Sequence, residues 1–448
     1  MTIQTTKSGA TEGGTQARAV PHRWRNLATL TGVTIVDNTE SGLSATLFPT
    51  IAAAMKLQSS HLGLLAALGK LVAVPAGPAW AWLAGRIGRR NALVATTMVG
   101  GAFGIAAGFS QDFIQLLIFN TLMSASIIGG SPIANAIIAD SFDDSQRAKA
   151  CGYFYGFVSL ISSVIAPLIA LFTGLSDGWR MGMWTVGGIC IAAGFVVALL
   201  LKDPGVGASE KELADLSSRD SVIPKATLRS VLSMFRIRSF SLMMLYRLLS
   251  GHLLITVFGI QFLVMERGFT NVVAAIVMVP FGLGFFAGSL GGGWLVTLLD
   301  RTMPDKGRIA FLQGAQILFA VVAFFATQLR YDTIVVYGIF WALMGFAQAL
   351  NPPVNRPIVA AIVPPELRNQ AFAIFLTVFE TITWAAMSLG AGALAATVGI
   401  QAVFLWVLVI LMLVNATVIT ALYFCYPRDV ARVRETLERR RQVALEQM

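Results

Sequence analysis

Apolar residues occur along this chain in long blocks separated by short polar segments. Each block approaches the roughly 20 residues that a helix needs to cross the hydrocarbon core of a bilayer. Helices are expected, because lipid offers no partner for an unpaired backbone amide or carbonyl. The predicted spans are residues 27–54, 60–84, 91–109, 112–138, 148–174, 181–201, 238–264, 270–299, 308–327, 332–357, 369–397 and 400–425. The pattern therefore predicts an all-α membrane protein with twelve transmembrane helices.

One long hydrophilic stretch divides the predicted spans six and six, and the two halves share a sequence pattern. Ser131-Pro132-Ile133-Ala134-Asn135 corresponds to Asn351-Pro352-Pro353-Val354-Asn355, and the arginine that follows each segment is Arg147 or Arg368. Such repeats indicate two pseudo-symmetric six-helix bundles related by an axis along the membrane normal. The predicted units are a leader (1–26), an N-terminal bundle (27–201), a linker (202–237), a C-terminal bundle (238–425) and an amphipathic tail (426–448).

Composition and charge agree with a membrane protein and argue against nucleic acid as a partner. Hydrophobic residues make up 56% of the chain and charged residues 12%, whereas soluble domains carry about 25% charge. Most of the 33 Lys and Arg fall in loops assigned to one side, which places both termini in the cytoplasm and the chain in the inner membrane. The three cysteines indicate neither a disulfide framework nor a metal site. No cofactor is expected, and we expect a monomer.

The tail carries Val430, Val433 and Leu437 on one helical face among many charges. This pattern predicts either a helix on the membrane surface, held by anionic lipid, or a solvated charged helix. The predicted partners of the chain are thus membrane lipids, a small-molecule substrate and protons.

Several loop segments resemble signatures of the major facilitator superfamily. Gly77-Pro78 followed by Leu83-Ala84-Gly85-Arg86-Ile87-Gly88-Arg89-Arg90 resembles the loop between helices 2 and 3 of that family. Ile138 to Phe142 with Arg147 is similar to the counterpart between helices 4 and 5, and Gly178-Trp179-Arg180 also resembles the family. The resemblance covers essentially the whole chain. It implies two bundles that rock around a central site, with cytoplasmic gating loops that contain Arg86, Gly88, Arg89, Arg90, Asp140, Arg147, Asp300 and Arg301.

Two positions depart from the family pattern. Gly85 stands where the family usually has a loop acid, so a cytoplasmic latch would depend more on Asp300. Asn120 lies near the position where proton-coupled drug exporters often carry an arginine, which weakens that specific assignment.

Ionisable residues inside the predicted spans are candidates for function, because a charge in the bilayer is costly. Asp37 and Glu40 lie three residues apart on one face of the first span. One interpretation is that either acid carries a coupling proton; the other is a permanently paired carboxylate. Glu380 in span 11 is a third proton-coupling candidate.

The family resemblance implies that spans 2 and 11 face each other across the two halves, which would bring Lys70 of span 2 close to Glu380 of span 11. They could form an interdomain ion pair, or Lys70 could reach Asp37 or Glu40, contact substrate or face a solvated cavity. Arg247 in span 7 is expected either to pair with an acid or to bind an anionic substrate group. His252 is more typical of a packing residue than of a proton carrier, and Arg356 is expected to reach the cytoplasmic membrane surface.

Polar stripes run along spans 4 and 10. Their members include Asn120 in span 4 and Trp341, Gln348, Asn351 and Asn355 in span 10. By the family resemblance these stripes would line a central cavity, and the alternative is hydrogen bonding between helices.

The chain lacks the motifs of a membrane enzyme or of a nucleotide-driven pump. We therefore predict a secondary active transporter that works by alternating access. The favoured hypothesis is proton-coupled export of an amphipathic compound, and the alternative is proton-coupled uptake of an organic anion or metabolite recognised by Arg247 or Lys70. A channel or a non-transporting membrane protein is a third class.

Overall fold

A computed structural model describes residues 20–57, 59–170, 172, 177–213, 224–304 and 306–446, and these residues form helices and loops without a strand. The all-α prediction is confirmed. Most of the predicted leader, residues 1–19, lies outside the described residues.

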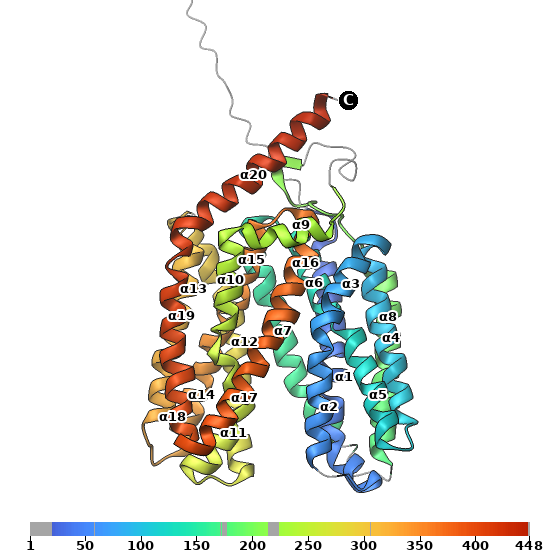
Figure 1. Ribbon diagram of the computed structural model, residues 1–448, viewed down its shortest axis with the longest axis vertical. Helices are drawn as coiled ribbons and strands as arrows, with labels where there is room; N and C mark the ends of the chain where they lie inside the picture. The colour runs from blue at the N-terminus through green and yellow to red at the C-terminus, as the bar shows by residue number, and fades with distance from the viewer. Residues whose placement is uncertain are drawn as a thin grey trace, which may run out of the picture.

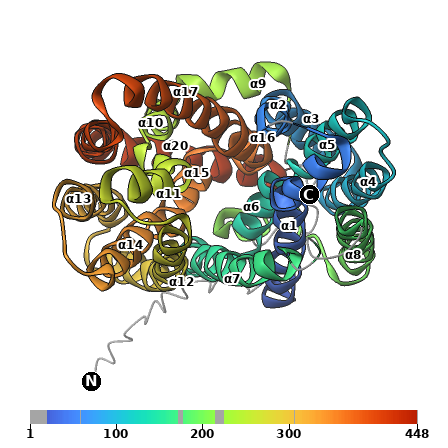
Figure 2. The same cartoon turned by 90° about the horizontal axis from the view of Figure 1, so that it is seen from below.

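The helices form two halves that stand side by side (Figures 1 and 2). The N-terminal half contains α1 (Arg23–Met55), α2 (Ser59–Leu71), α3 (Ala73–Ile87), α4 (Arg89–Gly108), α5 (Phe113–Ile127), α6 (Gly130–Ser141), α7 (Asp144–Ala170) and α8 (Gly178–Leu200). The linker carries the short η2 (Lys211–Leu213), α9 (Leu228–Ser233) and η4 (Met234–Arg236).

The C-terminal half contains α10 (Arg238–Leu248), η5 (Gly251–Leu253), α11 (Leu254–Arg267), α12 (Asn271–Thr302), α13 (Gly307–Gln328), α14 (Ile334–Ala349), α15 (Pro352–Ile362), η6 (Pro365–Leu367), α16 (Arg368–Ala373), the π-helical η7 (Ile374–Phe379), α17 (Glu380–Val398), α18 (Ile400–Phe404), η8 (Leu405–Ile410) and α19 (Leu411–Ile419). The last helix, α20 (Leu422–Glu446), extends away from this half (Figure 1).

Eleven helical segments in the described part of the chain are long and apolar enough to cross a membrane. Helix α1 is a further long helix besides these eleven, and its 33 residues correspond to about 50 Å at the rise of an α-helix. Helix α1 packs along α7 and α8 inside the N-terminal half. Its polar residues, including Asp37 and Glu40, explain why it is less apolar than the others.

Several membrane helices are interrupted near their middle. The helix predicted for span 4 is divided between α5 and α6 at Gly129, three residues before Pro132, and that for span 10 is divided between α14 and α15 just before Pro352. Proline cannot donate to the preceding turn and crowds it, which explains the bend. The equivalent proline positions give the two halves the same break.

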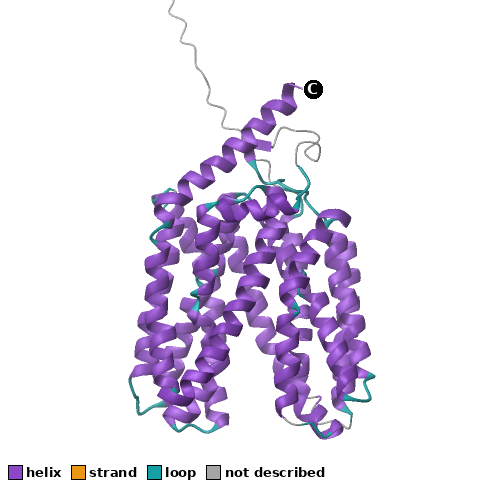
Figure 3. Ribbon diagram, in the orientation of Figure 1, coloured by secondary structure: helices purple, strands orange, loops and turns teal. Residues whose placement is uncertain are grey.

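The two halves converge at the end of the bundle where the linker and α20 lie, which we call the linker face, and diverge toward the opposite end (Figure 3). At the linker face α3 packs on α16 and η7, α6 on α16, and α7 on α12 and α15. A β carbon on Gly77 of α3 would collide with the side chain of Thr377 in η7. The halves are therefore closed against each other at the linker face.

Helix α20 begins at Leu422, earlier than the predicted tail, and its apolar face packs on protein. Leu437 is 1% exposed and contacts Leu213 of the linker, and Val430 is buried. Arg440 forms a two-pronged ion pair with Glu366 in η6, at 2.8 and 3.1 Å. The expected membrane-surface placement is wrong in this conformation, because the linker covers the face that lipid would have met.

Candidate functional site

A break in the helix of span 7 positions Arg247 between the two halves. Helix α10 ends at Leu248, and α11 starts at Leu254. A β carbon on Gly251 would collide with the carbonyl of Val407, so the close approach of η8 requires glycine here. The carbonyls released by the break find partners, because Asn415 donates to the Tyr246 carbonyl at 3.1 Å and Thr383 donates to the Arg247 carbonyl at 2.9 Å. The irregular backbone is thus satisfied by neighbouring side chains, as lipid-embedded structure requires.

Glu380, the first residue of α17, is surrounded by three cations. It forms an ion pair with Arg247, whose side chain is 5% exposed, while the Glu380 side chain is 38% exposed. The charges of Arg356 and Lys70 also act on the Glu380 carboxylate. Lys70 itself is exposed, and its Nζ lies 5.7 Å from the ring centre of Trp384. The expected Lys70–Glu380 ion pair is therefore replaced by Arg247–Glu380, and the cluster of Lys70, Arg247, Arg356 and Glu380 carries a net positive charge.

Arg356 is buried, at 7% exposed, and does not extend to the membrane surface. Its Nε donates to the hydroxyl of Tyr155 in α7 at 3.2 Å, and its Nη1 donates to Asn355 at 2.6 Å. Asn135 of α6 donates to the same tyrosine hydroxyl at 2.9 Å. A polar chain therefore crosses from one half to the other beside the cation cluster.

The predicted polar stripes are mostly occupied with hydrogen bonds inside each half. Asn120 accepts from Ser44 of α1 at 2.5 Å, and Asn351 accepts from Tyr246 at 2.7 Å and from Gln316. Trp341 is fully buried and its Nε1 contacts the sulfur of Met278.

Gln348 is also buried, at 8% exposed, and Asn355 is 0% exposed. In this conformation most of these side chains hold helices of one half together, whereas Oε1 of Gln348 has no hydrogen-bond partner among the described residues. That Trp341 and these amides line a central cavity therefore stays a prediction.

Asp37 and Glu40 are buried within the N-terminal half and lie away from the cation cluster. Glu40 is 0% exposed, and its carboxylate lies over Gly100 and Gly104 of α4, where β carbons would crowd it. Asp37, 7% exposed, lies against Gly130 of α6 in the same way. Both oxygens of Glu40 and Oδ1 of Asp37 have no hydrogen-bond partner among the described residues. The glycines thus create space for two acids that have no cation beside them in the described part of the chain.

Asp140 joins the two halves at the linker face. Its side chain is fully buried and accepts from Arg89 of α4 at 2.5 Å, and it also pairs with Arg368 of α16 in the other half. Arg89 reaches the linker through Asp203, likewise at 2.5 Å. A buried charge network of this kind is costly to break, by about 3–5 kcal/mol for removal of one partner. It therefore favours the closed arrangement of the linker face.

Glu210 of the linker contacts the two arginines that the sequence repeat relates. Its Oε1 accepts from Arg147 at 2.7 Å and from Arg368 at 2.5 Å. Each arginine also donates through Nε to the carbonyl of an equivalent alanine, Ala139 or Ala360. Burial alone would raise the pKa of Glu210, but the charges of Arg368 and Arg147 outweigh it and lower the pKa to about 2. The linker thus supplies an ionised carboxylate at the symmetry axis.

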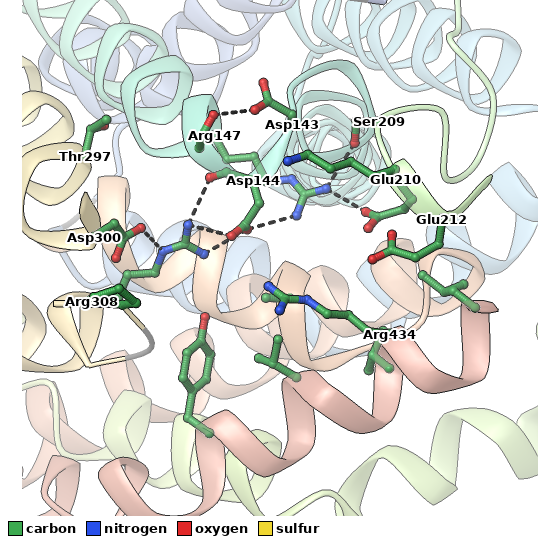
Figure 4. A pocket seen from close by; sticks show the side chains of 18 of the residues that line it. Asp143, Asp144, Arg147, Ser209, Glu210, Glu212, Thr297, Asp300, Arg308 and Arg434 are labelled. Atoms are coloured by element: carbon green, nitrogen blue, oxygen red, sulfur yellow. Dashed lines mark hydrogen bonds and ion pairs between the residues drawn. The ribbon is translucent and has the colours of Figure 1, made fainter. Parts of the chain in front are cut away.

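A second bridge connects the halves on the other side of the same region (Figure 4). Arg308 of α13 binds Asp144 of α7 through Nη2 at 2.7 Å and Asp300 through Nε at 2.6 Å. These residues line a cavity of about 610 Å³, which the linker residues Ser209 to Glu212 and the inner face of α20 complete. We call the Asp140, Glu210 and Asp144–Arg308 contacts together the linker-face latch. Asp300 takes part in this latch, and Gly85 has open space around it.

The remaining gating-loop candidates lie at the edge of the latch. Gly88 has a φ of 87°, which favours glycine and separates α3 from α4. Arg86 stacks on the Trp82 ring with its guanidinium carbon 3.9 Å from the ring centre. Arg90 donates to the Ala198 carbonyl, and Arg301 is exposed at the rim of the cavity.

Six residues of this arrangement were absent from the predicted site: Asp144, Tyr155, Asp203, Glu210, Arg308 and Arg368. The repeat had drawn attention to Arg368 and indicates its role, because its counterpart Arg147 was already a gating candidate. No local pattern marks Glu210 or Asp203, which reach the latch only because the linker folds back over both halves.

Two helical halves joined by a linker, with a charge cluster between them and a latch at the linker face, are typical of a secondary transporter. The sequence profile of the Major Facilitator Superfamily matches residues 30–341 and 304–446. The chain therefore belongs to this superfamily and is a multi-pass membrane transport protein, not an enzyme.

Relatives with assigned names are transporters that match part of the chain. A probable 4-methylmuconolactone transporter of Cupriavidus pinatubonensis is 28% identical over 199 residues, 44% of this chain and 44% of that protein. The shikimate transporter of Escherichia coli is 29% identical over 133 residues, 28% of this chain and 30% of that protein. The chain thus spans less than half the length of each of these relatives.

Solved structures agree in fold. A double tryptophan mutant of XylE gives a TM-score of 0.70 at 13% identity, covering 94% of this chain and 98% of that one. The human organic anion transporter MFSD10 gives a TM-score of 0.67 at 17% identity, covering 89% and 100%. The twelve-helix superfamily fold is confirmed.

Proposed function

We propose that this protein transports a small organic anion across the inner membrane by alternating access, coupled to protons, with the linker face in the cytoplasm. The observation that carries the proposal is the positive excess around Glu380. Three cations face one carboxylate between the two halves, and Arg247 Nε has no hydrogen-bond partner among the described residues. A substrate carboxylate would supply the charge that this cluster lacks.

Glu380 gives the cluster a direct means of coupling. Its carboxylate forms an ion pair with the Arg247 guanidinium. A substrate anion that takes this position displaces Glu380, and a proton then neutralises the displaced carboxyl group. Binding of the anion and of a proton are thereby linked through one arginine.

Asp37 and Glu40 are further proton-coupling candidates. Burying a carboxylate without a partner is expensive, so a proton on each acid would remove the penalty. Their positions inside the N-terminal half indicate a role in proton binding separate from substrate contact.

Export of an amphipathic compound is the other hypothesis. Relatives include the efflux pump FUB11 of Gibberella fujikuroi, 35% identical over 103 residues, 22% of this chain and 17% of that protein. The polar stripes that favoured an amphipathic substrate are used in packing, so the anion hypothesis has the stronger structural support. The direction of net flux under a pH gradient distinguishes the two.

The test is counterflow of radiolabelled cyclic carboxylates, shikimate among them, in proteoliposomes. Arg247→Gln is expected to raise KM by about 10- to 100-fold, because a charge-assisted hydrogen bond contributes roughly 1.5–3 kcal/mol. Lys70→Gln should have a smaller effect, and Lys56→Gln, an exposed lysine at the end of α1, serves as its control. Unchanged KM for anions in Arg247→Gln would refute the proposal.

A further inference from the structure

An apolar groove lies on the outer surface of the N-terminal half, between α1 and α7, which are neighbours at the periphery (Figure 2). It has a volume of about 450 Å³. The residues that line it are Trp24, Leu27, Ala28, Thr31, Gly32 and Ile35 of α1 and Tyr153, Phe157 and Ile161 of α7. The hydroxyl of Thr31 donates to its own helix at the Leu27 carbonyl, so the groove offers apolar surface almost throughout.

The length of the groove matches one leaflet of a bilayer. From Trp24 to Ile35 the helix rises about 16 Å, and half of the hydrocarbon core is about 15 Å thick. Gly32 forms an open floor, because a β carbon at this position would meet nothing within 4 Å. A single extended acyl chain fits such a space.

The end of the groove at the linker face has the aromatic side chains of a membrane interface. The ring of Trp24 lies 5.1 Å from that of Phe142 and 5.9 Å from that of Tyr153. Tryptophan and tyrosine favour the headgroup region of bilayers. The aromatic contacts therefore place this end of the groove at headgroup depth.

Two cations flank the same end. The guanidinium carbon of Arg23 lies 5.7 Å from the Phe142 ring centre. Lys149 precedes Tyr153 by one turn on α7, and its Nζ lies 4.6 Å from the Trp294 ring centre. Within the described part of the chain, the contacts found for both cations are with aromatic rings and not with carboxylates. Their charges are available to an external anion.

From this combination we infer a binding site for one anionic phospholipid of the linker-face leaflet. An acyl chain lies along the α1–α7 groove over Gly32, and the phosphate group lies between Arg23 and Lys149. Each basic residue near an anionic headgroup strengthens binding by roughly fivefold, the equivalent of about 1 kcal/mol. The site is separate from the cation cluster around Glu380 and does not depend on the substrate.

The experiment is native mass spectrometry of the purified full-length protein titrated with phosphatidylglycerol or phosphatidylethanolamine of identical acyl chains. One phosphatidylglycerol is expected to bind at least tenfold more tightly than phosphatidylethanolamine. Arg23→Gln with Lys149→Gln should remove this preference. Gly32→Phe should eliminate the bound lipid by filling the groove. Gly188→Phe, on exposed α8 surface where a β carbon also meets nothing, should leave binding unchanged.

Equal affinity for the two lipids in the wild-type protein would overturn the inference. So would retention of the lipid in Gly32→Phe. A thermal unfolding transition of each variant establishes that it is folded. If Gly32→Phe does not fold, the lipid preference of the Arg23→Gln, Lys149→Gln variant tests the inference by itself.

Discussion

Glu210→Gln is the sharpest test of the linker-face latch. The change keeps the size of the side chain and removes the charge that Arg147 and Arg368 share. The pKa of Glu210 falls from an ordinary 4.5 to about 2 in the closed arrangement, and each pH unit corresponds to about 1.4 kcal/mol, so the carboxylate favours closure by about 3 kcal/mol. A change of this size alters the ratio of closed to open forms by about 100-fold.

The sign of the linkage fixes the pH range of the effect. Because the pKa is lowered on closure, the stabilisation is complete above the ordinary pKa of 4.5 and is lost as the pH falls toward 2. Between pH 6 and pH 8 the contribution of Glu210 is therefore constant. Glu210→Gln at pH 7 should therefore destabilise the closed arrangement to the same extent as protonation of Glu210 at low pH.

The assay is double electron–electron resonance between spin labels on Asn91→Cys and Arg238→Cys, exposed positions at the linker face of opposite halves. Cys425→Ser removes the accessible native thiol, since Cys151 and Cys190 are buried. A population with a longer distance should appear in Glu210→Gln and be absent from the parent. Glu212→Gln, in the same linker segment, is the matched control.

An unchanged distance distribution in Glu210→Gln would contradict the reasoning, because it would mean that the closed state does not depend on the linker carboxylate. The same change in Glu212→Gln would show that any loss of linker charge is sufficient.

Three further predictions concern other parts of the molecule. Gly77→Leu should prevent closure against Thr377 and make the buried thiol of Cys151 in α7 react with an alkylating reagent at least tenfold faster; alkylation at the parent rate would argue against the close approach. Leu437→Ser should free α20 from Leu213 at a cost of about 2 kcal/mol, seen as at least tenfold faster amide exchange in α20 with the membrane helices unaffected. Glu40→Gln should abolish uptake driven by a pH gradient while counterflow persists, and intact pH-driven uptake would exclude Glu40 as a coupling site.

Much of the fold was predictable from the sequence because the bilayer imposes it. Block length and backbone hydrogen bonding require helices of a certain length. The repeat places Pro132 and Pro352 at corresponding positions, and the structure has matching breaks there. The gating residues Arg89, Asp140 and Arg147 were recognised from their loops, and the structure brings all three into one network.

The partners of the membrane charges could not be predicted in the same way. Helical spacing shows which residues share a face, but Glu380 contacts Arg247 because a break at Gly251 and a π-helical turn before Glu380 reorient both side chains. Amides such as Asn351 have the same sequence pattern whether they face a cavity or a neighbouring helix. Those choices depend on tertiary packing, which periodicity does not encode.

The position of Glu210 gives the connecting segment a part in the transport cycle. A chain that joins two moving bodies usually needs only to be long enough, and its sequence and length are then free to vary. Here the linker pairs with the N-terminal bundle through Asp203, and the Glu210 carboxylate pairs with an arginine of each bundle. Cutting it would leave both bundles intact, yet the protein would lose a contact that neither bundle contains by itself.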